Sequence, residues 1–484
     1  MPVAESFLPR TDYSMLPPGF SDAVGPASFP KLQLRFWNQR WAQRLGLGDL
    51  SAGEREQHFA KFVSLPGAQP QPLAMRYHGH QFRHYNPNLG DGRGFLFAQC
   101  EDPVDHRCLD FGTKGSGQTP YSRAGDGRLT LKGAVREALA TEMLESLGVR
   151  TSKTFCFFET GEALERNDEP SPTRAAVLTR LSHGHIRFGT FQRFAALGES
   201  DNIRKLLDYS LQTYWPEPEF SSDLRERTVQ FLELVIERSA RMCAQWMMAG
   251  FVHGVLNTDN MNITGESFDY GPWRFLPYYD PSFTAAYFDH EGLYSYARQP
   301  EAVYWNLDQL ARALFAMSPA ESLDRESWQA GFVERLEKFP GIFRKVLLES
   351  FFQRLGLVAD LDKIEQAETV FTAVFSHLRE TKCHFEKFFA DWFGGTKTTP
   401  LLPTEAPLQM ALELGFREGW ISVAAEAPSI LKEIERTRFQ PPSLLIDEVE
   451  KIWSAIDKSD DWSLFHSKIE NLRKRGRIYG FHLG

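Results

Sequence analysis

Two polar stretches of this 484-residue chain carry residue types that could bind a nucleotide. The first, DFGTKGSGQTPYSRAGDGR, covers residues 110–128 and sets Lys114 among several glycines. The second, FVHGVLNTDNMNITGESFDYGPW, covers residues 251–273 and concentrates four oxygen-bearing side chains, Asp259, Asn260, Asn262 and Asp269. An ammonium group can reach phosphate oxygens, and closely spaced oxygen ligands suit a hard cation such as Mg²⁺. An unremarkable alternative for the second stretch is a polar loop whose side chains cap turns.

Short motifs within these stretches must be tested against their structural context. Gly112-x4-Gly117 matches part of a P-loop, but Gln118 stands where a lysine is needed and Pro120 follows where a helix should begin. The DFG triplet at 110–112 precedes the nearest lysine, whereas the metal-binding triplet of kinases follows it. Asp110 is therefore predicted to end a strand. The second stretch lacks the spacing and closing glutamate of an EF-hand.

Composition favours a large globular enzyme. The chain is 42% apolar and 13% aromatic, which is enough to build a sizeable core. Its net charge of −9 argues against nucleic acid or an anionic membrane as the main partner. No apolar run reaches the roughly 18 residues of a membrane span, and the N-terminus lacks the pattern of a signal peptide. Five scattered cysteines without CxxC spacing predict a reduced, cytoplasmic protein without structural zinc.

The hydrophobic pattern predicts an α+β chain of two lobes. Apolar residues every four positions predict a helix over 131–147, and a longer stripe predicts another over 224–248. Short apolar runs in the first half, including 94–100, 108–112, 154–160 and 175–181, predict antiparallel strands. Helices dominate from about residue 200 onward. The expected units are an irregular N-terminal arm over 1–70, a strand-rich lobe over 71–200, a helical lobe core over 201–330 and a helical C-terminal extension over 331–484.

The order of these elements resembles that of a protein kinase. A strand lysine, a helix glutamate, further strands, a long helix, a His…Asn loop and an Asp-x-Gly triplet follow one another in kinases. Here Lys114, Glu137, the 224–248 helix, His253…Asn260 and Asp269-Tyr270-Gly271 occur in the same order. Asp269, not Asp110, then takes the metal-binding position. Lys114 would reach phosphate oxygens and pair with Glu137.

Four longer segments identify a specific family. GDGRG (90–94), FGTKGSGQTPYSRAGDGRLTLKGAVREAL (111–139), LTRLSHGHIRFGTF (178–191) and HGVLNTDNMNITGESFDYGP (253–272) closely resemble the selenoprotein O family. The resemblance covers roughly residues 75–315. It implies a kinase-like two-lobed fold that binds ATP in a flipped orientation. It also implies transfer of AMP, rather than phosphate, to hydroxyl side chains of protein substrates, here Ser, Thr or Tyr.

The resemblance also implies a role for each matching residue. Asp259 would be the general base, Asn260 and Asp269 would bind Mg²⁺ (or Mn²⁺), and Glu137 would orient Lys114. The implied nucleotide contacts are Gly90, Gly92, Arg93, Lys114, Asp126, Gly127, Arg180, Arg187 and Asp269. Four cationic side chains among them suit a triphosphate, and the glycines would let backbone N–H groups approach it.

Some features depart from the family, and other functions stay open. The resemblance weakens after residue 315, the last cysteine is Cys383, and a terminal cysteine or selenocysteine is missing, so no redox role is expected there. One alternative is a metalloenzyme using the His-x-His pairs within 77–85 and 182–189. A second is a non-catalytic ATP-binding scaffold, and a third is an ordinary phosphotransferase.

Overall fold

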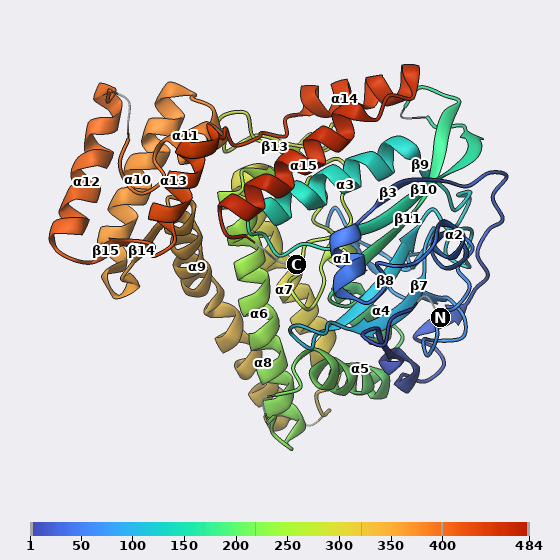
Figure 1. The fold of residues 1–484 in the computed structure, drawn as a ribbon. Helices are drawn as coiled ribbons and strands as arrows, with labels where there is room; N and C mark the ends of the chain where they lie inside the picture. Colours follow the sequence, from blue (N-terminus) through green and yellow to red (C-terminus); the bar gives the residue numbers. More distant parts are fainter. Residues whose placement is uncertain (1–2, 168, 218, 321, 398–399, 482–484) are drawn as a thin grey trace.

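The computed structural model describes residues 3–167, 169–217, 219–320, 322–397 and 400–481 of the chain. One large antiparallel sheet dominates the first half, and helices dominate the second (Figure 1). This is the α+β organisation that the sequence predicts, and it is compatible with a two-lobed kinase-like fold. Within the described ranges, no helix is both long and apolar enough to cross a bilayer.

Nine strands form the main sheet, in the order β2-β4-β7-β8-β11-β10-β3, with β1 beside β7 and β9 beside β11. The strands are β1 Leu8–Arg10, β2 Ser21–Ala23, β3 Gln33–Trp37, β4 Leu73–Met75, β7 Leu96–Glu101, β8 Cys108–Lys114, β9 Leu129–Thr130, β10 Lys153–Leu164 and β11 Thr173–Ser182. All seven residues of β8 are buried because apolar clusters cover both faces of the sheet. Residues 1–70, for which the sequence predicts only an arm with short helices, supply β1, β2 and β3 as well as α1 (Gln39–Arg44) and α2 (Ala52–Phe59).

The helix after β9 is α3, Leu131–Ser146, as the four-residue repeat predicts. The hydroxyl of Thr130 caps it by accepting a hydrogen bond from the backbone N–H of Gly133. Most of its residues are buried on every side, because strands β10 and β11 pack on it and α15 (Ser463–Ile478) packs across it. Glu137 therefore projects from a helix that has little room to move.

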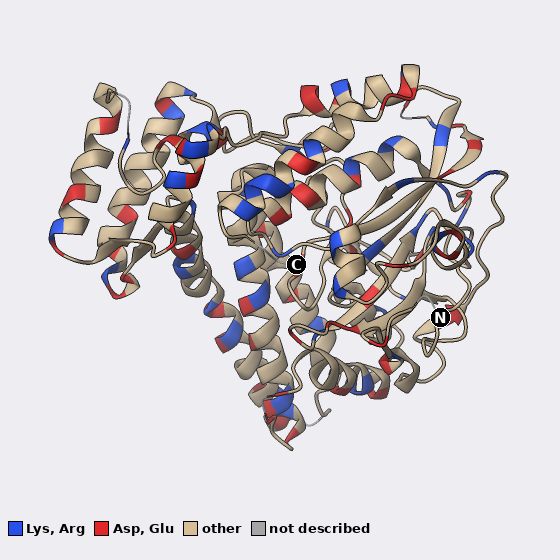
Figure 2. Cartoon of the chain, in the orientation of Figure 1, with Lys and Arg blue, Asp and Glu red and all other residues tan. Residues whose placement is uncertain are grey.

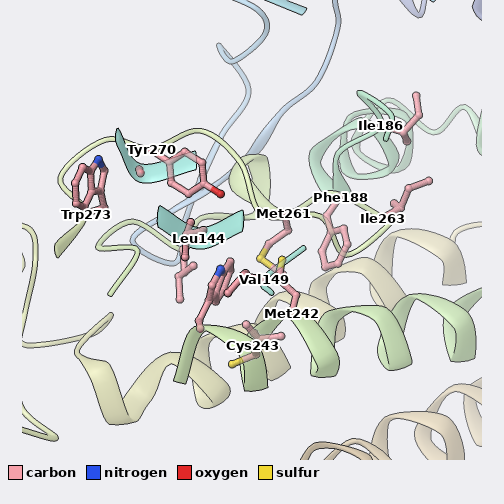
Figure 3. Packing of buried hydrophobic residues seen from close by; sticks show 14 of the residues in the cluster. Leu144, Val149, Ile186, Phe188, Met242, Cys243, Met261, Ile263, Tyr270 and Trp273 are labelled. Carbon is pink, nitrogen blue, oxygen red and sulfur yellow. The ribbon is translucent and has the colours of Figure 1, made fainter. Parts of the chain in front are cut away.

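The second half is a helical lobe. Its helices are α4 Phe188–Ala196, α5 Ser200–Tyr214, α6 Leu224–Met248, α7 Gln299–Phe315, α8 Ser322–Glu337 and α9 Phe339–Arg354. The longest, α6, has the bounds that the apolar stripe predicts. Figure 3 shows Met242 and Cys243 of α6 lying beneath Met261 and Leu144, all members of one buried cluster. The polar stretch 251–273 thus rests on a rigid apolar base.

Short strands and turns shape the loops around this base. A hairpin of β5 (Gly79–Gln81) and β6 (His84–Asn86) precedes the main sheet's central strands, and β12 (Phe251–Val252) pairs with β13 (Arg274–Phe275). Residues Thr258–Asn260 form a single 3₁₀ turn. Lysine and arginine alternate with aspartate and glutamate along the helices in Figure 2, so neither sign dominates in this view.

The C-terminal region has two parts. An outlying group at the left of Figure 1 contains α10 Ile364–Thr381, α11 Phe385–Asp391, α12 Ala406–Arg417, α13 Ala427–Thr437, β14 Leu357–Ala359 and β15 Ile421–Val423. The chain then returns through α14 (Ile446–Ser459) and α15 to lie over α3. Arg473 of α15 pairs with Glu142 of α3, and Lys132 of α3 pairs with Glu450 of α14.

A buried charge network joins these two parts. Glu386 of α11 accepts hydrogen bonds from Arg354 (2.8 Å) and Arg475 (2.6 Å), and all three side chains are at least nine-tenths buried. Arg475 also donates to the backbone carbonyl of Ser146 at the end of α3. Burial alone would raise the pKa of Glu386, but the two arginines outweigh it and lower the pKa to about 2.

Replacing Glu386 by Gln should lower the free energy of unfolding by about 3–5 kcal/mol, because two buried guanidinium groups would lose their counter-charge. Denaturant unfolding measures the change. The matched control is Glu368→Gln, which removes an exposed partner of Arg344 on the surface and should leave the unfolding midpoint unchanged. Equal effects of the two substitutions would contradict the structural importance of the buried network.

Candidate active site

Lys114, the last residue of β8, is the centre of the site. Its ammonium group lies 2.8 Å from Glu137 Oε2 on α3 and 3.0 Å from Asp269 Oδ1. The side chain is 8% exposed, and that of Glu137 only 1%. The pairing that the order of elements predicts is therefore present, and it links the sheet, α3 and the polar loop.

Arg180 lies on β11, directly beside β8. Its backbone pairs with Gly112, which places its guanidinium next to the lysine. One guanidinium nitrogen, Nη1, lies 3.6 Å from Asp269 Oδ1 and 3.9 Å from Glu137 Oε1. Although buried, this nitrogen makes no hydrogen bond within the described part of the chain. The guanidinium also stacks on the Phe268 ring, so its position is fixed while its Nη1 donor is unsatisfied.

Arg187 precedes α4 and is also buried. Its guanidinium lies between the rings of Tyr77 and Phe268, 4.5 and 4.8 Å from their centroids. It donates a hydrogen bond of 2.7 Å to the backbone carbonyl of Asp259 and lies 3.4 Å from Asp91. Two aromatic faces and a carbonyl thus hold a second arginine beside the lysine.

The carboxylate of Asp269 interacts electrostatically with all three cationic side chains. Its backbone has φ of 64°, a conformation that non-glycine residues rarely adopt. Burial raises the pKa of its carboxyl group, but Lys114, Arg180 and Arg187 outweigh burial and hold the pKa well below its usual range. Asp269 is therefore ionised, and its Oδ2 accepts a hydrogen bond of 2.9 Å from the side-chain amide of Asn260.

The donor set of Asn260 and Asp269 fits Mg²⁺. An ionised carboxylate and an amide oxygen are hard ligands, and Mg²⁺ usually takes only one or two protein ligands together with phosphate and water. Across the described residues, no cluster of three or more His, Cys, Asp or Glu side chains could hold a metal by itself. A cation here would depend on phosphate oxygens to complete its coordination.

Asp259 occupies the 3₁₀ turn beside this pair, and it is also buried. Burial raises the pKa of its carboxyl group to about 6, although Arg187 opposes the shift. The Oδ1 atom has no hydrogen-bond partner among the described residues. The neighbouring Thr258 hydroxyl donates to Gln192 and accepts from the backbone N–H of His80, which anchors the turn. A fixed carboxylate with a raised pKa can accept a proton near neutral pH.

These side chains line a cavity of about 750 Å³. Its wall includes every predicted nucleotide or metal contact and the predicted base: Gly90, Gly92, Arg93, Lys114, Asp126, Gly127, Arg180, Arg187, Asp259, Asn260 and Asp269. Glu137 lies behind Lys114 rather than on the wall. The sequence segments singled out in both halves of the chain thus converge on one cavity. The role of each residue remains a proposal.

The rim of the cavity is more exposed to solvent than its inner end. Asp126 is exposed and forms an ion pair of 2.8 Å with Arg166, so its carboxylate is engaged away from the buried cations. Gly127 has φ of 70°, which favours glycine. A Cβ atom on Gly90 would lie 2.3 Å from the Tyr121 ring. The absence of a side chain at Gly90 therefore also allows two loops to pack closely, a constraint that the local sequence does not reveal.

Several cavity residues were not predicted from the sequence. They include Tyr77, Gln81, Asp91, Arg123, Arg166, Val255 and Asn257. Asp91 lies inside the GDGRG segment, and the need for a carboxylate beside a buried arginine could have identified it. Arg123 and Arg166 lie in turn-rich segments where arginine is usually solvated, so no local signal distinguishes them.

The alternative motifs have other roles. The histidines of the two His-x-His pairs bond to separate partners: His78 to Tyr85, His80 to Gln192, His183 to the Cys108 carbonyl and His185 to Asp110. Asp110 is buried on β8 and accepts a hydrogen bond from Gln99, away from the cavity. The segment from Gly112 to Lys114 is strand, which a P-loop is not.

Comparison with known proteins identifies similar sequences along almost the whole chain. A family model described as "Protein adenylyltransferase SelO" matches residues 6–473. The chain is similar to the protein nucleotidyltransferase YdiU of Synechocystis sp., with 41% identity over 94% of this chain and 95% of the relative. It is 43% identical to the protein of the same name from Gloeobacter violaceus, over 96% of this chain and 94% of the relative.

The raised pKa of Asp259 predicts a pH-dependent cost of folding. Because the folded state binds this proton more tightly than the unfolded state, the ionised carboxylate destabilises the fold fully above pH 6. The cost fades as pH falls towards the ordinary value of 3.8. In chelator-treated protein at pH 8, Asp259→Asn should raise the free energy of unfolding by up to about 3 kcal/mol, and the gain should vanish near pH 4.

The control is Asp269→Asn, measured by the same denaturant titrations. Asp269 has a lowered pKa, so its neutralisation should destabilise the protein at pH 8. A destabilising Asp259→Asn substitution at pH 8 would contradict a buried Asp259 carboxylate whose ionisation destabilises the folded state.

Proposed function

The chain belongs to the protein adenylyltransferase SelO family, and we propose that it transfers AMP from ATP to Ser, Thr or Tyr hydroxyl groups of other proteins. The family makes the chain a nucleotidyltransferase whose two substrates are ATP and a protein. We further propose that ATP is bound in the flipped orientation, with its γ-phosphate at the inner end of the cavity.

The distribution of buried charge carries this proposal. The side chains of Lys114, Arg180 and Arg187 are each at most 8% exposed and lie together at the inner end. An uncharged adenine ring placed there could accept a hydrogen bond through a ring nitrogen, but it would bring no negative charge to the three buried cations or to the unsatisfied donor of Arg180. Phosphate oxygens would accept from it and neutralise the cations. This supports an orientation of ATP in which the triphosphate lies at the inner end of the cavity.

The rim offers a different environment. Arg93 and Asp126 are exposed to solvent, and Ala124 and Gly125 leave space beside them. A nucleoside placed here would lie against exposed side chains and would not have to enter the group of buried cations. With the γ-phosphate inside and the nucleoside outside, the α-phosphorus would lie between the buried cations and the mouth of the cavity. An acceptor hydroxyl arriving from solvent would meet the α-phosphorus first.

Asn260 and Asp269 are the residues that would hold Mg²⁺, or Mn²⁺ in its place. The bound cation would supply positive charge that neutralises phosphate oxygens. Asn260 already orients Asp269 through its amide N–H, so the chain positions the carboxylate before any cation binds.

The chain's own residues account for the chemical step. The hydroxyl oxygen of the acceptor side chain would form a bond to the α-phosphorus, and Asp259 would accept the proton of that hydroxyl group. The bond between the α-phosphorus and the bridging oxygen of pyrophosphate then breaks, and pyrophosphate leaves with the electron pair. Lys114, Arg180 and Arg187 would stabilise the charge that develops on pyrophosphate. Glu137 would keep Lys114 in place through their 2.8 Å contact.

Parallel reactions with ATP labelled on the α- or the γ-phosphate test this proposal. With Mg²⁺ and a protein acceptor, label should enter protein from α-labelled ATP alone. Asp269→Ala should reduce the rate at least about a hundredfold, since removing a charge-stabilising group in an active site commonly costs 10²–10³. Glu368→Gln, an exposed carboxylate on α10, is the matched control and should be as active as the wild type.

Two results would contradict the proposal. Label from γ-labelled ATP alone would make the chain a phosphotransferase. Binding of ATP without label from either position, with every acceptor protein tested and with the chain itself, would indicate a scaffold.

A further inference from the structure

Two aromatic side chains stand exposed in the loop between β13 and α7. Tyr287 is 79% exposed and Phe288 is 43% exposed. Phe288 packs against Tyr287 on one side, with ring centroids 5.1 Å apart, and against Phe82 of the β5–β6 turn on the other, at 5.8 Å. We call Phe82, Phe288 and Tyr287 the aromatic ridge. Exposed aromatic side chains in contact with one another are typical of protein-binding surfaces.

The loop holds the ridge in a fixed position. The Asp289 carboxylate accepts hydrogen bonds from the backbone N–H groups of Leu293 and Tyr294, both at 2.8 Å. The Tyr294 ring lies 5.1 Å from that of Phe82. The exposed rings are therefore presented by a hydrogen-bonded turn, and binding would order little additional chain.

The ridge adjoins residues of the cavity wall. Asn257, which lines the cavity, accepts hydrogen bonds from the Phe82 backbone N–H (3.1 Å) and from the Tyr294 hydroxyl (3.0 Å). Gln81, the neighbour of Phe82, also lines the cavity. Asn257 precedes Asp259 by two residues. A polypeptide that brings a hydroxyl to Asp259 would pass close to the ridge.

Two arginines near the ridge share one carboxylate. Arg83 lies 2.8 Å from Glu301 and over the Trp305 ring, and Arg298 pairs with the same glutamate at 3.1 Å. One carboxylate thus engages both arginines. With these two arginines engaged, the exposed rings are the feature that the ridge offers to a partner, which favours an apolar occupant.

Resting on the proposed function, we propose that the aromatic ridge docks the acceptor protein by receiving an apolar or aromatic side chain near the acceptor hydroxyl. The ridge then contributes to the choice of acceptor while the buried cations bind ATP. It should affect KM for the acceptor and leave KM for ATP unchanged.

Synthetic peptides of equal length test this role. Each carries one serine in an alanine background, with a single Phe or a single Asp at successive positions on either side. AMP transfer from α-labelled ATP gives kcat and KM for each peptide. The variants are Tyr287→Ser, Tyr287→Phe, which keeps the ring and removes the hydroxyl, and Met410→Ser. Met410 is 70% exposed on α12 in the outlying group, so its replacement removes similar apolar surface elsewhere (Figure 1).

The wild type should prefer Phe over Ala and Asp at one or two positions. Tyr287→Ser should abolish that preference and lower kcat/KM for the preferred peptide roughly tenfold, mainly through KM, as for truncation of an interface aromatic. Tyr287→Phe and Met410→Ser should behave as the wild type. A preference that survives Tyr287→Ser, transfer without any preference, or labelling of the chain itself but of no peptide would overturn the docking role alone. Absence of all AMP transfer by the wild type would overturn the proposed function and the docking role together.

Discussion

The contact between Lys114, Glu137 and Asp269 is the constraint on which the site depends. It joins the end of a central strand, the middle of α3 and the polar loop, three elements that are far apart in sequence. Charges taken out of water are costly unless they are paired, so both carboxylates depend on the ammonium group of Lys114. Arg180 and Arg187 extend the group but leave one donor unsatisfied. In the proposed function, a phosphate oxygen of ATP accepts from that donor.

The remainder of the fold keeps these elements in register. Strands β8 and β11 are adjacent, so Lys114 and Arg180 face the same cavity. The sheet holds α3 on one side, and α15 holds it on another through the pair of Arg473 and Glu142. Met261 and its neighbours anchor the polar loop on the core above α6 (Figure 3). The position of Glu137 thus depends in part on a helix near the C-terminus that packs on α3. The paired residues Glu142 and Arg473 are 331 positions apart in the sequence.

Local patterns in the sequence predicted the elements that have strong periodicity. The repeat from Leu131 to Met143 marked α3, the apolar stripe marked α6, and the chain order of Lys114, Glu137 and Asp269 indicated their meeting. The four segments that resemble the family contain the residues predicted to contact the nucleotide or metal, and all of these residues lie on the cavity wall. Strands β1 to β3 were missed because each has only three to five residues and depends on pairing with distant strands. The ion pair of Asp126 with Arg166 and the packing of Gly90 on Tyr121 arise only from tertiary contacts. The aromatic ridge had no sequence signal for the same reason.

The orientation of ATP is the central claim, and a crystal structure of the chain with an ATP analogue that cannot be cleaved between its α- and β-phosphates tests it most directly. The expected complex has the γ-phosphate against Arg180 and Arg187 and the adenine near Arg123 at the rim. Adenine beside Arg180, with the γ-phosphate at the mouth of the cavity, would contradict the account. It would leave the unsatisfied Nη1 donor of Arg180 without the phosphate oxygen that the account assigns to it.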